Sequence, residues 1–127
     1  MYNNEIENLL NIKIQTRPTG IFQDVVLKKY ELCDDSAAIF LAFELPTGRI
    51  ITKRYQKRNL IHFIEDVLTQ LHRPVDNTVI RDLLNELVLD ELPLAVQLDW
   101  IKVQKEDTDR VTYAPILDFR IANKYYK

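Results

Sequence analysis

The stretch Ala37-Ala-Ile-Phe-Leu-Ala-Phe-Glu-Leu-Pro-Thr-Gly-Arg-Ile-Ile-Thr-Lys-Arg-Tyr55 decides the fold of this chain. Its first half, from Ala37 to Leu45, alternates with a period of two, which is the side-chain period of a β-strand. One face carries Ile39, Leu41, Phe43 and Leu45, and the other carries Ala38, Phe40, Ala42 and Glu44. Pro46-Thr47-Gly48 supplies a turn, and Arg49 to Tyr55 then predicts the returning strand of an antiparallel hairpin.

The segments on either side of this hairpin predict one more strand before it and two helices after it. Residues 21–32 are rich in β-branched and aromatic side chains, and Asp34-Asp35-Ser36 supplies the turn that follows them. After the hairpin, Asn59 is a good N-cap, and apolar residues at helical spacing from Leu60 to Leu71 predict a helix that ends near His72-Arg73-Pro74. A second helix is expected over 76–91, where five acids face a single cation.

Two closing strands complete the pattern, with a charged turn at 105–109 between them. Leu94 to Ile101 alternates, and so does Val111 to Ile121, where Pro115 removes one ladder donor and therefore belongs at a sheet edge or a bulge. The predicted fold is mainly β with α: a five-stranded OB-like barrel or curved antiparallel sheet, with a two-helix insert between the third and fourth strands. We expect a domain over 20–122, an N-terminal arm or short helix over 1–19, and a C-terminal tail over 123–127.

Composition limits the class of protein. A chain of 127 residues with 46% hydrophobic and 28% charged residues suits one globular domain. Cys33 is the single cysteine, so neither an internal disulfide nor a thiolate zinc site is expected, and two glycines are too few for phosphate-cradling loops. Because no leader-like start and no run of eighteen apolar residues occurs, we expect a cytoplasmic protein that does not enter a membrane.

The segment 49–58 carries five positive charges and no negative charge, although the formal net charge of the chain is −2. Cations on one sheet face beside an aromatic ring suit a nucleic acid, because the cations meet phosphates while a base stacks on the ring. The alternative is a solvated edge strand whose charges discourage aggregation.

Stacking candidates must be aromatic and exposed. Phe40 lies between two alanines on the face opposite the apolar set, unless the helices cover that face. Tyr55 is expected to stack beside Lys53; alternatively Tyr55 closes the core and Arg54 faces outward. Trp100 and Tyr113 share faces with aliphatic residues, which favours core packing. The predicted nucleic-acid-binding residues are Lys28, Lys29, Tyr30, Phe40, Arg49, Lys53, Arg54, Tyr55, Lys57 and Arg58.

Three stretches together resemble a known family. They are Val25 to Tyr55, Ile80 to Val88 leading into Val96 to Trp100, and Val111 to Phe119. Over residues 20 to 121 the chain resembles the small OB-fold single-stranded-DNA-binding proteins of phages and conjugative elements. The resemblance implies sequence-tolerant binding of single-stranded DNA or RNA in the replication or transfer of a mobile element. The chain departs from that family in its longer helical insert, its scarcity of glycine and its lack of an acidic tail.

The inventory of catalytic groups is poor. His62 and His72 are ten residues apart and do not share a helix face, and no serine or zinc-protease motif accompanies them. We therefore expect no enzyme activity, no cofactor and no metal. A nuclease that uses Asp24, Glu44 and Asp99 with Lys53 is the enzymatic alternative.

The main rival function is a protein-interaction module, such as a phage structural, adaptor or host-defence-inhibiting protein. Its working surface would be the acidic second helix, because that helix would repel phosphates. The sequence leaves a homo-oligomer open.

Overall fold

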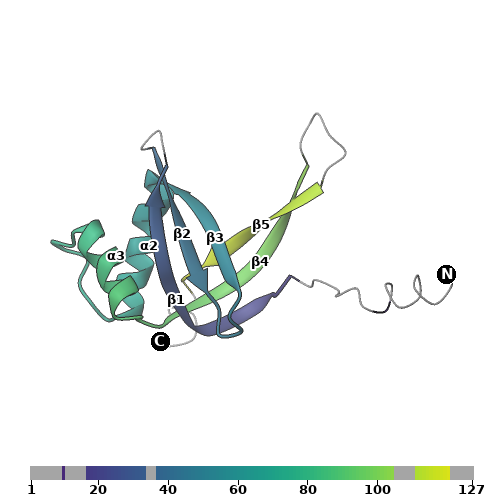
Figure 1. Cartoon of the computed structure of the whole chain (residues 1–127). Coiled ribbons are helices and arrows are strands. Elements are labelled where there is room, and N and C mark those ends of the chain that lie inside the picture. The colour runs from purple at the N-terminus through teal and green to yellow at the C-terminus, as the bar shows by residue number, and fades with distance from the viewer. Residues whose placement is uncertain (1–9, 11–16, 34–36, 105–110, 121–127) are drawn as a thin grey trace.

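The computed structural model describes residues 10, 17–33, 37–104 and 111–120. Five strands and two helices follow one another along this part of the chain (Figure 1). In order they are β1 (Gly20–Leu32), β2 (Ala38–Glu44), β3 (Ile50–Gln56), α2 (Lys57–Gln70), α3 (Ile80–Leu89), β4 (Leu94–Gln104) and β5 (Val111–Asp118). The expected tail at 123–127, and most of the expected arm at 1–19, lie outside the described residues.

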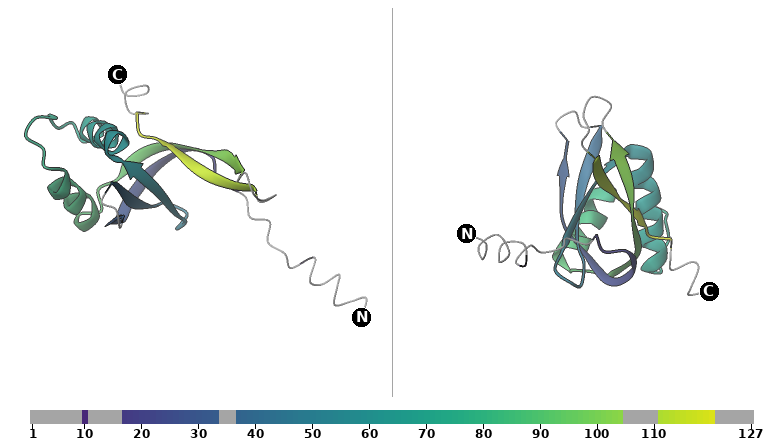
Figure 2. Two further views of the ribbon diagram at one scale, coloured as in Figure 1. Left: turned by 90° about the horizontal axis from the view of Figure 1, so that it is seen from above. Right: turned by 90° about the vertical axis from the view of Figure 1, so that its right-hand side faces the viewer.

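The five strands form one antiparallel sheet in the order β3-β2-β1-β4-β5, curled into a half-barrel (Figure 2). The two end strands of the sheet approach each other where the Lys53 Nζ atom donates a hydrogen bond to the carbonyl oxygen of Pro115, at 3.0 Å. Both helices lie between the third and fourth strands in the chain. The predicted fold class is therefore confirmed, and the curled sheet is consistent with an OB-like fold.

Strand β1 lets the sheet curl because its two halves pair with different neighbours. Residues 20–25 pair with β4, and residues 26–32 pair with β2. The register shifts between Phe22 and Val25, where Asp24 has a positive φ of 59°, and again between Leu27 and Lys29. Each extra residue bends the strand and increases its twist, so the irregularities of β1 turn a flat sheet into a half-barrel.

The hairpin of β2 and β3 has the predicted period and turn. The cross-strand pairs Ile39–Tyr55 and Phe43–Ile51 share the buried face, while Phe40–Arg54 lies on the other face. Gly48 closes the turn with a φ of 91°, and its backbone N–H donates to the carbonyl oxygen of Leu45 at 2.8 Å. Glycine suits this position because L side chains rarely adopt that conformation.

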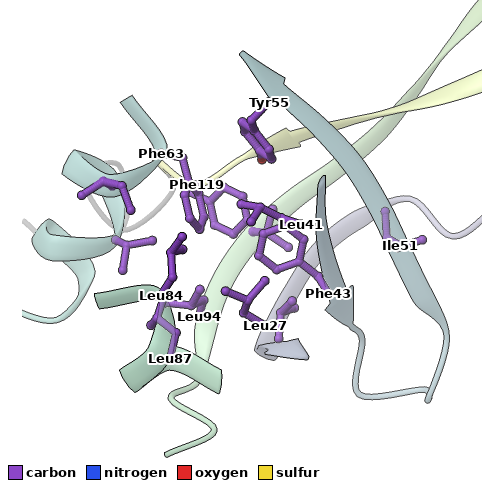
Figure 3. Packing of buried hydrophobic residues seen from close by; sticks show 14 of the residues in the cluster. Leu27, Leu41, Phe43, Ile51, Tyr55, Phe63, Leu84, Leu87, Leu94 and Phe119 are labelled. Atoms are coloured by element: carbon purple, nitrogen blue, oxygen red, sulfur yellow. The ribbon is translucent and has the colours of Figure 1, made fainter. Parts of the chain in front are cut away.

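The core lies between the buried face of the sheet and the two helices. Three phenylalanine rings meet at its centre: Phe43, Phe63 and Phe119 have ring-centroid separations of 4.9–5.7 Å (Figure 3). They come from β2, from α2 and from the residue just after β5, so one aromatic cluster joins three parts of the fold. Aliphatic side chains from β1, β4 and α3 complete the core.

Gln70, the last residue of α2, ties that helix to both closing strands. Its side-chain amide donates to the carbonyl oxygens of Ala95 and Phe119 at 2.7 and 2.9 Å, and its Oε1 accepts from the Ala95 N–H at 2.7 Å. Three backbone groups in partly buried positions thus obtain a partner from one side chain.

Several element boundaries differ from the expected ones. Helix α2 begins at Lys57, directly after β3, so Asn59 lies within its first turn and is not the N-cap. Helix α3 begins at Ile80 rather than near 76, and β4 continues to Gln104, three residues beyond the expected end. Strand β5 ends at Asp118, and the expected last residue of that strand, Ile121, lies outside the described residues. As predicted, Pro115 lies in a strand at the end of the sheet order.

The helices in the described part of the chain are too short or too polar to span a membrane.

Candidate nucleic-acid interface

The face of β1, β2 and β3 that points away from the helices is the candidate interface, and we call it the outer face. Phe40 occupies its middle strand with 40% of its surface exposed. Its neighbours across the sheet are Arg54 on β3 and Glu31 on β1. Ala38 and Ala42, two positions before and after Phe40, are buried and too small to cover its ring. The expectation that the Phe40 ring is accessible is confirmed.

Cations lie on both sides of Phe40 on the outer face. Arg54 is exposed on β3, and Lys29 is exposed on β1 opposite Ala42. Lys28 is also exposed, but it is partly neutralised, because its Nζ lies 3.8 Å from a Glu44 carboxylate oxygen and 3.2 Å from one of Glu91. Arg54 and Lys29 are therefore the outer-face cations best placed to meet a phosphate.

The expectation that Tyr55 stacks on a base is wrong, because only 5% of its surface is exposed. Its ring packs 5.5 Å from that of Phe63 in the core (Figure 3). Burial first, and then the charge of Asp66, raise the pKa of Tyr55 above its ordinary value. Strand alternation explains the result, since Ile51 and Tyr55 share the face that the helices cover.

Lys53 also lies on the inner side of β3, half-buried, so it does not join Arg54 on the outer face. Its ammonium is 5.9 Å from the centre of the Tyr55 ring. Burial lowers the pKa of Lys53, because a half-buried site disfavours the charged form. Lys53 and Arg54, two consecutive cations of the segment 49–58, therefore point to opposite faces of β3.

The remaining residues predicted to bind nucleic acid lie in three separate parts of the structure. The Tyr30 hydroxyl donates to the Asn85 Oδ1 atom on α3, so Tyr30 faces the helices and not the outer face. The Arg49 guanidinium lies 5.7 Å from the centre of the Trp100 ring. Lys57 and Arg58 are exposed in the first turn of α2.

The far end of the β4–β5 hairpin exposes aromatic surface that the sequence did not lead us to expect. Tyr113 is 42% exposed, and the Arg17 guanidinium lies 3.5 Å from its ring centre. Trp100 is half-buried, and its indole N–H donates to the carbonyl oxygen of Pro18 at 2.8 Å. Core packing was the wrong expectation for Tyr113, because this hairpin extends beyond the helices (Figure 1). The alternation of residues along a strand does not indicate how far the helices extend over the sheet.

A cleft of about 530 Å³ opens on the inner side of β3, between β3, α2 and the C-terminal end of β5. Polar and charged side chains line one part of it, and rings and aliphatic groups line the other. The polar lining is Lys53, Asn59, His62, Asp66, Asp118 and Arg120; the apolar lining is Tyr55, Phe63, Ile116, Leu117 and Phe119.

Two carboxylates of this cleft differ in their surroundings. Asp118 forms an ion pair with Arg120, whose Nε atom lies 3.0 Å from Asp118 Oδ1. Burial raises the pKa of Asp66, with a smaller opposing contribution from Arg120. Asp66 is therefore more easily protonated than an ordinary aspartate.

The acidic character of the second helical segment is partly neutralised within the chain. The Glu86 carboxylate accepts two hydrogen bonds from the Arg73 guanidinium, and Glu91 pairs with Lys28. In the described ranges, no cluster of three or more His, Cys, Asp or Glu residues could hold a metal ion, and the carboxylates of the nuclease alternative form no such group.

Comparisons with protein-family models, with curated proteins and with solved structures gave no match. The case for a function therefore rests on the geometry of the outer face and the cleft.

Proposed function

We propose that this protein binds single-stranded DNA or RNA without sequence preference, in the replication or transfer of a phage or other mobile element. The observation that carries the proposal is the accessible ring of Phe40 directly across from Arg54, in the middle of the outer face. A base can lie on the ring while the guanidinium meets the neighbouring phosphate. OB-like folds use the face of their second and third strands for oligonucleotides, and Phe40 and Arg54 lie on those two strands.

The structure narrows the proposed contact set. Phe40, Arg54 and Lys29 form its centre, and Lys28 extends it along β1. Lys57 and Arg58 extend the positive charge past the end of β3. The contact set no longer includes Tyr55, because its ring is buried in the core. It no longer includes Tyr30 either, because the Tyr30 hydroxyl donates to Asn85 on the helix side of the sheet.

Fluorescence anisotropy of a labelled oligothymidylate of about 15 nucleotides tests the proposal at low salt, since one OB-like domain covers about 4–16 nucleotides. Phe40→Ala should weaken binding roughly 5- to 150-fold, because stacking contributes about 1–3 kcal/mol per base. Tyr113→Ala removes an equally exposed ring away from the outer face and should leave the affinity unchanged.

Salt dependence gives a second readout. Arg54→Gln should reduce the slope of log affinity against log salt by about 0.7, the value for one single-strand phosphate contact. The proposal fails if wild-type protein shows no binding at low salt, or if Phe40→Ala and Tyr113→Ala behave alike.

One observation supports the rival function, a protein-interaction module. Leu89 at the end of α3 is 80% exposed, beside the acids Asp90 and Glu91. The acids next to Leu89 suit a protein partner that carries positive charge. A stoichiometric partner that survives nuclease treatment and is lost in Leu89→Asp would favour this function.

A further inference from the structure

The β4–β5 hairpin loses its neighbouring strand beyond Leu98, where the pairing of β4 with β1 ends. Gly20, the first residue of β1, faces Leu98, so residues 99–104 and 111–116 continue as a two-stranded ribbon (Figure 1). Two-stranded ribbons are only marginally stable in water without a further strand or a packed layer. Large apolar side chains of this ribbon are 40–53% exposed, namely Ile101, Val103, Val111, Tyr113 and Ile116. The ribbon therefore presents a surface that a partner would cover.

Two hydrogen bonds show which backbone groups of the ribbon point outward. The Pro115 carbonyl oxygen accepts a hydrogen bond from a β3 side chain, so it points away from β4. The residue opposite Pro115 is Trp100, whose backbone N–H donates to the Asp99 Oδ1 atom at 2.8 Å. Trp100 and Pro115 are therefore a non-hydrogen-bonded pair. Because such pairs alternate with hydrogen-bonded pairs along an antiparallel ladder, Val111 and Tyr113 also direct their N–H and C=O groups away from β4.

Strand β5 is the end strand of the sheet that lacks charged side chains along this edge. In the described part of the chain it pairs with β4 alone, and residues 111–117 carry no charge. Folded proteins usually protect an end strand with charges, as Lys53 and Arg54 do on β3. Pro115 limits pairing only at its own position, because it has no N–H to donate. The outward groups of Val111 and Tyr113 thus form a short, uncharged template for another strand.

A second copy of the chain fits this template. An uncharged edge does not attract a nucleic acid, whereas a two-fold contact joins the same surface of two copies and here places no like charges opposite each other. With Thr112 on the two-fold axis, Val111 lies opposite Tyr113 of the second copy. Each such pair exchanges both of its outward N–H and C=O groups, and Pro115 stays outside the pairing. Valine beside a tyrosine ring is also a favourable cross-strand pair.

We propose that two copies of this protein pair antiparallel through β5, with Thr112 on the two-fold axis, and that their two sheets become continuous. The contact is short, so it falls below the roughly 800 Å² per partner of a standard interface. We therefore expect a weak dimer whose dissociation constant is micromolar or higher. The contact does not use the outer face, so dimerisation and the proposed nucleic-acid binding can fail independently.

Disulfide crosslinking tests the register in a Cys33→Ser background, which removes the single native cysteine. Thr112→Cys places two thiols at a non-hydrogen-bonded pair, whose Cα atoms lie about 4.5 Å apart and suit a disulfide. Val103→Cys is the matched control, because Val103 is also exposed and faces Thr112 across the β4–β5 ladder. In the dimer it lies three strand spacings, about 14 Å, from its copy. In glutathione buffer, Thr112→Cys should crosslink at least about 10-fold faster than Val103→Cys.

Sedimentation of nuclease-treated protein measures the dimer without a covalent link. Wild-type protein should shift from monomer to dimer as its concentration rises towards about 1 mM. Thr112→Glu places two carboxylates opposite each other on the axis and should weaken dimerisation at least about 10-fold. Val103→Glu adds the same charge on the same face, away from the axis, and should dimerise like wild type. Circular dichroism checks that both variants fold, and the crosslinking rates decide the question if Thr112→Glu does not.

Three results would overturn the proposal. Wild-type protein that stays monomeric at about 1 mM would show that something other than a second copy covers the ribbon. A dimer that Thr112→Glu and Val103→Glu affect equally would place the interface elsewhere. Equal crosslinking rates for Thr112→Cys and Val103→Cys would exclude the β5 register.

Discussion

Replacing Tyr55 by Phe should stabilise this protein, although Tyr55 is one of its most buried aromatic residues. The ring makes the core contact with Phe63, and phenylalanine keeps that contact. The hydroxyl is buried and has no partner among the described residues. The substitution therefore removes an unfavourable group and leaves the ring packing in place.

The size of the effect follows from the cost of an unsatisfied buried group, which is about 1–3 kcal/mol. Part of that gain is lost because a small void remains where the oxygen was. We expect the free energy of unfolding to rise by about 1 kcal/mol and the melting temperature by about 3–5 °C for a domain of this size. For the wild type and Tyr55→Phe, urea unfolding gives the free energy of unfolding and a thermal melt gives the melting temperature, both followed by circular dichroism.

Tyr30→Phe is the matched control. The Tyr30 hydroxyl donates to Asn85 on α3, so its removal should lower the free energy of unfolding by about 0.5–1.5 kcal/mol. The same chemical change thus has opposite signs at two tyrosines of one sheet face.

Alkaline pH provides an independent test of the same side chain. The pKa of Tyr55 is raised in the folded protein, by burial and then by Asp66, so the unfolded chain loses this proton first, near pH 10. Stability that is present below pH 10 is therefore lost above it, by about 1.4 kcal/mol per pH unit from this group. Other groups titrate in the same range, but the difference between wild type and Tyr55→Phe isolates Tyr55. A Tyr55→Phe variant that is destabilised at pH 7, with no growing advantage above pH 10, would refute the reasoning.

Three further substitutions test other parts of the fold by urea unfolding. Gln70→Leu leaves the N–H and carbonyl of Ala95 and the carbonyl of Phe119 without their partner and should cost about 2–4 kcal/mol, while Thr69→Val at the exposed neighbour should cost under about 0.5 kcal/mol. Asp66→Asn should raise the free energy of unfolding at pH 7, because burial raises the Asp66 pKa and the folded wild type loses stability as this carboxyl ionises. A difference between variant and wild type that is the same at pH 4 and pH 7 would contradict this. Gly48→Ala should cost about 1 kcal/mol from backbone strain alone, since an added Cβ meets no atom within 4 Å; an unchanged midpoint would show that the turn relaxes.

The local patterns of the sequence were sufficient to predict most of the fold. The alternation of β2, the turn at Gly48 and the helical spacing from Leu60 to Leu71 each predict the element that the structure contains, because each depends on neighbours within a few residues. Boundaries were less predictable. Asn59 looks like an N-cap, but the chain passes from β3 into α2 without a loop, and the helix begins at Lys57.

The candidate site was predicted only in part. Phe40 could be identified as accessible because alanines flank it and its alternation opposes the apolar set. The face of β3 could not be assigned, since Ile51, Lys53 and Tyr55 alternate with Thr52 and Arg54 and neither set is plainly apolar. Nucleic-acid contact by any of these residues stays a prediction.

The amino-acid sequence by itself determined the elements of this protein, their order and the positive charge of the segment 49–58, because period, turn residues and charge are local properties. Only the tertiary structure decided that Lys53 and Arg54 point to opposite faces of β3, that the buried Tyr55 hydroxyl has no hydrogen-bond partner among the residues described, and that Arg120 and His62 line one cleft. These facts depend on which side of β3 the helices cover and on how far the sheet curls to bring β5 towards β3, and both are set by packing between residues far apart in the chain.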